Sequence, residues 1–311
     1  MNKYAIAIHG GAGTITRSSL TPDKDKAYRD ALEQAIMAGH SVLQGGGTAL
    51  DAVELAVVHL ENNPLFNAGK GSVFTKEGKH EMDAAIMCGR TLEAGAVAGV
   101  RSIKNPVKLC RAIMEYSDHV MLSSYGAEEF ARNHAVEFAP EKYFFDAFRY
   151  NQWTEIRDSD IFMLDHTENA EKKFGTVGAV ALDMEGNTAA ATSTGGMTNK
   201  QYNRIGDTPI IGSGNYANNK TCAVSCTGHG EFFMRAVVAY DVSCLVEYKG
   251  YTLQQACDEV VMKKLVDFGG EGGLIALNTA GEVVLSFNSE GMYRASKIGD
   301  EKTFTGIYKE V

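Results

Sequence analysis

The residues that most clearly suggest chemistry in this sequence are Gly175 and Thr176. They stand where a charged segment without glycine gives way to alternating small and apolar residues. A threonine hydroxyl is a weak nucleophile unless a base stands beside it, and the residue's own α-amine is one such base. That amine is free only if the chain is cut between Gly175 and Thr176, and a pKa of roughly 7.7–8.0 then suits it to general base catalysis. Taken alone, the pair more often marks an ordinary strand threonine after a glycine turn.

The composition indicates a globular protein with a large core. The chain has 311 residues, of which 44% are hydrophobic, enough for one domain or two. Its net charge is −9 and neither sign forms a long run, so nucleic acid and anionic membranes are poor partners. No apolar stretch is long enough to span a bilayer, and the first residues lack the pattern of a signal peptide, so we expect a cytoplasmic protein.

The cysteines and glycines indicate the redox compartment of the protein and the kind of turn at residues 9–13. The 6 cysteines are scattered and form no CxxC motif, which favours buried free thiols in a reducing compartment over a structural zinc site. One glycine cluster, residues 9–13, follows a strand-like run at 4–8. It lacks the GxGxxG spacing of a phosphate loop, so we interpret it as a turn that ends the strand close to a site. His9 is interpreted as a hydrogen-bonded histidine of the core or of the site edge.

Periodic apolar spacing predicts most of the regular elements. Two amphipathic helices in the N-terminal half, the first ending at Gly45 and the second starting at Thr48, suggest a layer that covers a sheet. Two hairpins in the C-terminal half enclose two more helices. Mostly antiparallel sheets flanked by helices follow, so we assign the chain to the α+β class. The expected helices are 23–43, 48–61, 105–114, 126–135, 231–248 and 252–265, and the expected strands are 4–8, 81–88, 92–100, 120–122, 177–183, 187–193, 274–278 and 282–287.

Two segments lack the pattern of a regular element. Residues 137–173 mix aromatic and charged side chains without sustained periodicity, and their second half is typical of a surface linker leading into Gly175. The loop at 60–74 is too apolar for a solvated linker and too rich in turn-forming residues for a helix or strand. Its carbonyl groups, turned inward, would hold a monovalent cation, and its asparagine would be able to donate an amide hydrogen to a substrate.

Seven segments taken together resemble the plant-type L-asparaginase family, also called isoaspartyl peptidases, among the N-terminal nucleophile hydrolases. They occur in the family's order and span nearly the whole chain. Their joint occurrence by chance is implausible, so the resemblance makes Thr176 the candidate nucleophile. The segments are His9–Gly13, Asn63–Gly69, Ala94–Val100, Gly175–Asp183, Thr192–Lys200, Arg204–Asp207 and Cys226–Glu231.

The resemblance implies a four-layer αββα sandwich, a single domain over residues 1–311 that is made as a precursor and cuts itself between Gly175 and Thr176. Residues 1–175 would form an α subunit, with a linker at about 137–175 that becomes flexible towards its end. Residues 176–311 would form a β subunit that begins at the nucleophile. Because the family usually pairs two cleaved protomers, a homodimer of composition α2β2 is implied as well.

The implied reaction releases L-aspartate from L-asparagine and from β-aspartyl dipeptides, through a covalent β-aspartyl ester of Thr176. Thr194 matches the family's second threonine, whose hydroxyl holds the nucleophile and its amine in place. Thr227 and Asn67 match the donors to the oxyanion. Each such donor contributes on the order of 3 kcal/mol to the transition state.

The resemblance also supplies substrate-binding residues. Arg204 matches the arginine that grips the substrate's α-carboxylate, an anion that suits a planar guanidinium better than an ammonium. Asp207 matches the acceptor for the α-ammonium; without the family, these two residues would be interpreted as a surface ion pair. Gly228 and Gly230 match positions where bare backbone approaches the ammonium. His229 falls where relatives carry a small hydroxyl residue or histidine, which leaves the preferred leaving group open.

No catalytic cofactor is implied, but a structural sodium ion is. The loop at 60–70 matches the family's sodium loop, in which hard carbonyl oxygens hold the ion and shape the segment that carries Asn67. The ligands would be the carbonyls of Leu60, Glu61, Asn63, Phe66, Ala68 and Lys70.

Two other functions stay open at this point. A glycosylasparaginase-like enzyme would remove N-linked sugar from asparagine; the cysteine usage and the N-terminal residues argue against it, and sugar release from a glycosyl-asparagine would decide. A non-catalytic module would hold free amino acids with Arg204 and Asp207, and it would bind aspartate without ever being cleaved.

Overall fold

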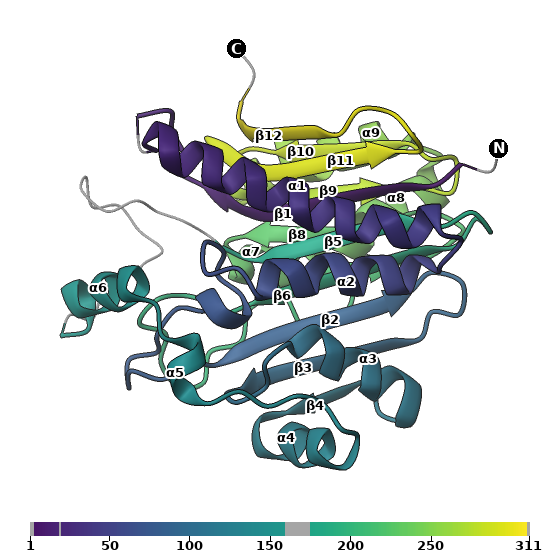
Figure 1. The fold of residues 1–311 in the computed structure, drawn as a ribbon. Helices are drawn as coiled ribbons and strands as arrows, with labels where there is room; N and C mark the ends of the chain where they lie inside the picture. The colour runs from purple at the N-terminus through teal and green to yellow at the C-terminus, as the bar shows by residue number, and fades with distance from the viewer. Residues whose placement is uncertain (1–2, 19, 159–174, 310–311) are drawn as a thin grey trace.

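Two β-sheets form the centre of the computed structural model, which describes residues 3–18, 20–158 and 175–309 (Figure 1). The larger sheet has the strand order β12-β11-β1-β5-β6-β2-β3-β4, and the smaller has the order β10-β9-β8-β7. Neighbouring strands in the described residues run antiparallel, apart from the parallel pair β3 and β4. The strands are β1 (Ala5–Gly13), β2 (Met82–Cys88), β3 (Ala94–Val100), β4 (Met121–Ser123), β5 (Val177–Leu182), β6 (Thr188–Thr194), β7 (Asn215–Ala217), β8 (Ala223–Gly228), β9 (Gly272–Leu277), β10 (Val283–Phe287), β11 (Gly291–Ile298) and β12 (Phe304–Tyr308).

Helices cover both sheets. Helices α1, α2 and α3 pack on the larger sheet, and α8 and α9 pack on the smaller one, while β1, β5 and β6 contact strands of the smaller sheet. Figure 1 shows α1 and α2 side by side across the face of the larger sheet. The helices are α1 (Pro22–Gln44), α2 (Ala49–Glu61), η1 (Gly69–Gly71), α3 (Pro106–Tyr116), α4 (Ser124–Asn133), α5 (Glu141–Phe144), α6 (Ala147–Ile156), α7 (Gly230–Ala236), α8 (Val238–Lys249), α9 (Leu253–Asp258), η2 (Glu259–Lys264) and α10 (Leu265–Asp267).

Local sequence explains where the two long helices begin and which face they bury. Thr21 and Thr48 each cap a helix by accepting a backbone N–H three residues later, from Lys24 and Asp51. The apolar stripe of α1 is buried against the larger sheet. No helix among residues 3–18, 20–158 and 175–309 is long and apolar enough to cross a membrane.

Apolar side chains fill the space on both sides of each sheet. One cluster joins α1, α2 and α3 to the larger sheet, and another joins α8 and α9 to the smaller sheet. A third lies between the two sheets, where Val180 and Leu182 of β5 meet Ile275 and Leu277 of β9. The mixture of helices with two mostly antiparallel sheets confirms the predicted α and β content.

The structure corrects four local predictions. The segment at 9–13 is not a turn: β1 continues through Gly13, and a β-bulge between His9 and Ala12 absorbs the glycines. The helix expected at 231–248 is broken at Val237, whose φ of 50° starts a new helix. The helix expected at 252–265 contains the π-helical turn η2. The first part of the expected linker forms α5 and α6, and its second part lies outside the described residues.

Candidate active site

Thr176 lies at the start of β5, beside the end of β6. The pairing of Val177 with Ser193 brings the next residues along, Thr176 and Thr194, close together. The Thr176 hydroxyl donates to the Thr194 hydroxyl over 3.2 Å, and both residues are buried. The Thr194 hydroxyl oxygen also accepts the backbone N–H of Gly196 at 3.0 Å, and this hydrogen bond fixes the position of the Thr194 hydroxyl.

His9 fixes the backbone of Thr176 from the neighbouring strand β1. Its Nδ1 lies 3.0 Å from the carbonyl oxygen of Thr176, and because a carbonyl only accepts, Nδ1 carries the proton. Nε2 therefore accepts from the Ser225 hydroxyl at 2.8 Å, and Ser225 in turn lies 2.7 Å from the Thr192 hydroxyl. Burial lowers the pKa of His9 to about 3, so the ring stays neutral. This agrees with the interpretation of His9 as a hydrogen-bonded histidine at the site edge.

A cleft opens beside the two threonines. Its free space is about 20 Å³ with the bond between Gly175 and Thr176 intact, which admits a water molecule but not an amino acid. Most of the predicted catalytic and substrate-binding residues are among its lining, whereas Asn67 and Thr227 are not. The lining residues are Gly175, Thr176, Thr194, Gly196, Met197, Arg204, Gly206, Asp207, Thr208, Gly228 and Gly230.

Asp207 brings a buried carboxylate to this cleft. Its Oδ2 has no hydrogen-bond partner in the described part of the chain, and only 4% of the residue is exposed. Burial raises the pKa of Asp207 to about 7, against the opposing effect of the positive charge on Arg204. A buried carboxylate in this state favours a proton or a cation as its partner. The site therefore offers a strong acceptor for an ammonium group.

Arg204 does not form the surface ion pair with Asp207 that the bare sequence favoured. Its Nε and Nη2 atoms instead donate to the two carboxylate oxygens of Glu231, each over 2.8 Å. Burial alone would raise the pKa of Glu231, but the hydrogen bonds from Arg204 lower it below its ordinary value. Glu231 occupies the edge of the guanidinium formed by Nε and Nη2. In the described part of the chain Nη1 donates no hydrogen bond, so the other edge can bind a second carboxylate.

The two candidate oxyanion donors differ in how they are held. The Thr227 hydroxyl is buried on β8 and has no hydrogen-bond partner among the described residues. The Asn67 Oδ1 accepts the Val73 N–H at 3.0 Å, and its Nδ2 donates to the Gly196 carbonyl at 2.6 Å. An amide nitrogen has two hydrogens, so Asn67 keeps one for another acceptor.

Two positions in the site are glycine because neighbouring atoms leave no room for a side chain. A Cβ on Gly175 would lie 2.2 Å from the Cβ of Asn67, so the candidate cleavage point is packed directly against that residue. A Cβ on Gly230 would lie 2.8 Å from Asp207 Oδ1 and 2.9 Å from Arg204 Nη2. Any side chain at Gly230 would therefore fill the space between the two charged groups.

The segment at 60–71, which runs from the last turn of α2 through a loop to η1, offers the ligands that an alkali ion prefers. Its candidate ligands are backbone carbonyls, which are hard and neutral. Four of them accept backbone N–H groups of the same segment: Leu60, Asn63, Phe66 and Ala68. Each such oxygen has a second lone pair for an ion. Elsewhere in the described ranges, no three His, Cys, Asp or Glu side chains gather as metal ligands. The residues present thus fit a monovalent cation.

Two residues of the site, Glu231 and His9, have contacts that no local pattern in the sequence predicts. Glu231 ends the segment Cys226–Glu231, and its position one residue after Gly230 is the only sequence signal that places it near Arg204. The contact of His9 with Thr176 joins residues 167 positions apart, which depends on the pairing of β1 with β5.

The sequence is similar to known proteins over nearly its whole length. The sequence model of the family described as asparaginase matches residues 2–307. The chain is 50% identical to the isoaspartyl peptidase of Escherichia coli (strain K12) over 313 aligned positions, which cover 100% of this chain and 98% of that protein. It is 40% identical to the isoaspartyl peptidase/L-asparaginase of Xenopus laevis, across 98% of this chain and 96% of that one. The chain belongs to the asparaginase family.

Proposed function

We propose that this chain is a self-cleaving threonine hydrolase that releases L-aspartate from β-aspartyl dipeptides and from L-asparagine. The observation that carries the proposal is the cleft in which the paired hydroxyls of Thr176 and Thr194 lie with the opposite charges of Arg204 and Asp207. The printed names of the relatives, isoaspartyl peptidase and isoaspartyl peptidase/L-asparaginase, support the same substrates. The layering of helices outside two facing sheets supports the αββα sandwich of the N-terminal nucleophile hydrolases.

The first step is the cut between Gly175 and Thr176. The Thr176 hydroxyl oxygen attacks the Gly175 carbonyl carbon, and the acyl group moves from nitrogen to oxygen as the peptide C–N bond breaks. Water then hydrolyses the ester, which leaves a carboxylate on Gly175 and a free α-amine on Thr176. The fragments are 1–175 and 176–311, the proposed α and β subunits, and we propose that two cleaved protomers pair.

The mature enzyme then uses both groups of Thr176. Its amine accepts the hydroxyl proton while Oγ1 attacks the side-chain carbonyl of the substrate. The oxyanion that forms is stabilised by the Thr227 hydroxyl and the Asn67 amide, whose unused hydrogens support this role. The amine returns the proton to the leaving nitrogen, and a β-aspartyl ester of Thr176 results. Water, deprotonated by the same amine, releases aspartate and restores the hydroxyl.

Substrate selection rests on the two charges beside the nucleophile. Arg204 binds the α-carboxylate through the edge that Glu231 leaves open, and Asp207 binds the α-ammonium. Gly228 and Gly230 leave room for that ammonium. A substrate without either charge would leave a buried group unpaired, which penalises it strongly.

A sodium ion bound by the carbonyls of the 60–70 loop would neutralise their dipoles and fix the shape of the segment that carries Asn67. The reaction itself needs no electron carrier or activated group, because Thr176 supplies both nucleophile and base.

Substitution of the nucleophile tests the proposal. Thr176→Ala is expected to stay a single chain on a denaturing gel and to release no aspartate from a β-aspartyl dipeptide, whereas the parent gives two fragments and is active. Thr91→Ala, in the exposed turn between β2 and β3, is the matched control and should cleave like the parent. Full activity of Thr176→Ala would overturn the proposal, and so would activity of a parent protein that keeps its uncut mass.

A further inference from the structure

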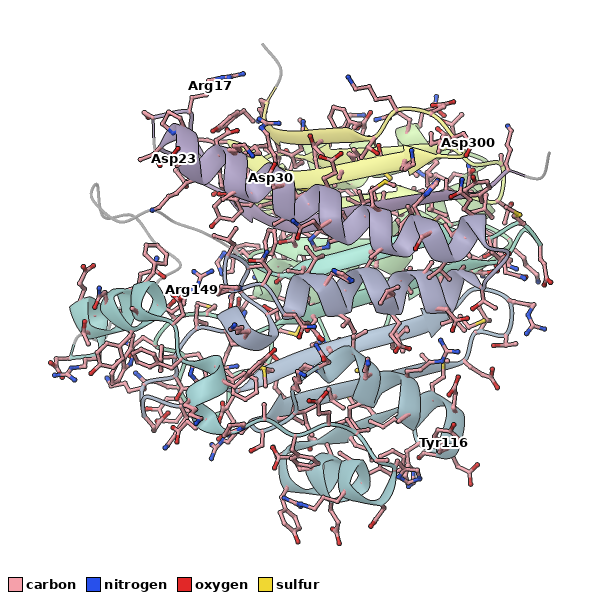
Figure 2. All side chains as sticks on the ribbon, viewed as in Figure 1. Arg17, Asp23, Asp30, Tyr116, Arg149 and Asp300 are labelled. Atoms are coloured by element: carbon pink, nitrogen blue, oxygen red, sulfur yellow. The ribbon has the colours of Figure 1, made fainter. Side chains whose placement is uncertain are left out.

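Arg149, labelled in Figure 2, lies on α6 and buries its guanidinium against the loop that carries Asn67. Only 4% of the residue is exposed. Its Nε donates to the Gly71 carbonyl at 3.2 Å, its Nη2 to the Leu65 carbonyl at 3.3 Å and its Nη1 to Gln152 Oε1 at 3.3 Å. These guanidinium hydrogen bonds all go to neutral oxygens. A buried cation held by neutral oxygens is costly, so we expect this guanidinium to have a specific role.

The two carbonyls bracket Asn67 in the chain. Leu65 precedes it by two residues and Gly71 follows it by four, so a single planar guanidinium ties the two ends of the intervening turn together. Within the turn, Asn67 is bound through its own carbonyl to the Gly195 N–H at 3.0 Å. Its side chain accepts from the Val73 N–H, two residues beyond Gly71, and donates to the Gly196 carbonyl. A shift of Gly71 would move Val73 with it, so the direction of the Asn67 amide depends on how the end of the loop is held.

The rest of α6 supports the same region. The ring of Trp153 stacks on Phe74 with centroids 5.7 Å apart, and Tyr150 meets Phe74 edge-on at 5.8 Å. The Ile156 carbonyl accepts from the Asn199 side chain at 3.2 Å, and the backbone N–H of Asn199 donates to the Phe74 carbonyl at 2.8 Å. Helix α6 thus joins the end of the Asn67 loop to the segment that follows Thr194.

We propose that Arg149 is a positioning residue, which aims the Asn67 amide at the oxyanion by holding the carbonyls of Leu65 and Gly71. The inference rests on the proposed function above, because it takes Asn67 as an oxyanion donor. The α-amino acid part of the substrate is held separately by Arg204 and Asp207. Loss of Arg149 should therefore lower kcat and leave KM nearly unchanged.

A double-mutant cycle on the cleaved enzyme tests this coupling. The variants are Arg149→Met, Asn67→Ala and the double variant, with a β-aspartyl dipeptide as substrate at fixed NaCl concentration. Asn67→Ala is expected to lower kcat by about 100-fold, as loss of one oxyanion donor does. Arg149→Met should lower kcat by about 30-fold with KM within about threefold, and the double variant should fall no further than Asn67→Ala. Arg157→Met, an exposed arginine at the end of the same helix, is the control and should behave like the parent.

The possible outcomes separate the two proposals. If the losses of kcat multiply in the double variant, Arg149 supports only the fold and the inference is wrong. If instead Thr176→Ala is active, the proposed function has failed before Arg149 is considered. If Arg149→Met does not fold or does not cleave, Arg149→Lys replaces it in the same cycle, because lysine keeps the positive charge but can reach only one of the two carbonyls. The cycle is then measured on kcat and on the rate at which the two fragments appear.

Discussion

The negative charge of Asp207 is predicted to lower the free energy of unfolding of this protein. Its pKa is raised from 3.8 to about 7 by burial, a shift of about 3 units that corresponds to about 4 kcal/mol. Between about pH 4 and pH 7 the native protein holds a proton that the unfolded chain has released. Stability therefore falls as the pH rises through this window, and above pH 7 the whole penalty is present.

Replacing Asp207 by asparagine should recover part of this free energy. The amide carries no charge but leaves a buried polar group without a partner, which costs about 1–3 kcal/mol. A net gain of about 2 kcal/mol at pH 8 is expected, and a net loss of about 2 kcal/mol at pH 4, where the native carboxyl is protonated and only the cost of the amide remains. With an unfolding entropy of about 2.1 cal/mol/K per residue over 311 residues, 2 kcal/mol raises Tm by about 3 °C.

The measurement is thermal unfolding of uncut protein at pH 4, 6 and 8. Both proteins carry Thr176→Ala, so that cleavage does not alter Tm, and they differ only in Asp207→Asn. The same comparison with Asp118→Asn, an exposed aspartate, is the control and should give equal Tm values. A stabilisation by Asp207→Asn that is the same at all three pH values, or a loss of stability at pH 8, would refute the reasoning.

Two further predictions concern other carboxylates. Glu231→Ala should raise KM for a β-aspartyl dipeptide about fivefold with kcat within about twofold, because a half-exposed pair that orients Arg204 contributes about 1 kcal/mol. Steady-state kinetics check this prediction. A lower KM would mean that Glu231 competes with the substrate for Arg204. Burial raises the pKa of Glu61 to about 7 despite the hydrogen bond from Ser193, so stability falls between about pH 4.5 and pH 7. Glu61→Gln in the Thr176→Ala background should reduce that fall in Tm, and an unchanged pH dependence would contradict it.

The sequence predicted the elements whose patterns are local. The cap at Thr48, the apolar stripe of α1 and the hairpin of β5 and β6 each depend on neighbours within a few residues. Strand β11 was missed because Arg294 interrupts its pattern. The structure buries that guanidinium, which donates to the carbonyls of Met292 and Tyr308, so a charged residue stands where an apolar one is expected.

Helix α6 was missed for a related reason. Its side chains do not form one apolar stripe: Trp153 and Tyr150 surround Phe74, while Arg149 reaches the backbone of another loop. A periodic apolar stripe predicts a helix that packs on a sheet, whereas α6 packs around the ring of Phe74. The break at Val237 had no signal either, because a β-branched residue rarely adopts positive φ.

The polar groups around Thr176 divide into two kinds, and the division supports the proposed chemistry. His9, Ser225 and Thr192 form a buried chain in which each group has a partner, so they hold the nucleophile's backbone rigidly. Asp207 Oδ2 and Thr227 Oγ1 are buried without partners in the described residues, although buried polar atoms in proteins are nearly always paired. An α-ammonium and an oxyanion would satisfy these two atoms, and a β-aspartyl substrate supplies both in one molecule. In the proposed function, Asp207 and Thr227 therefore bind the substrate, and the partnered groups fix the position of the threonine that attacks it.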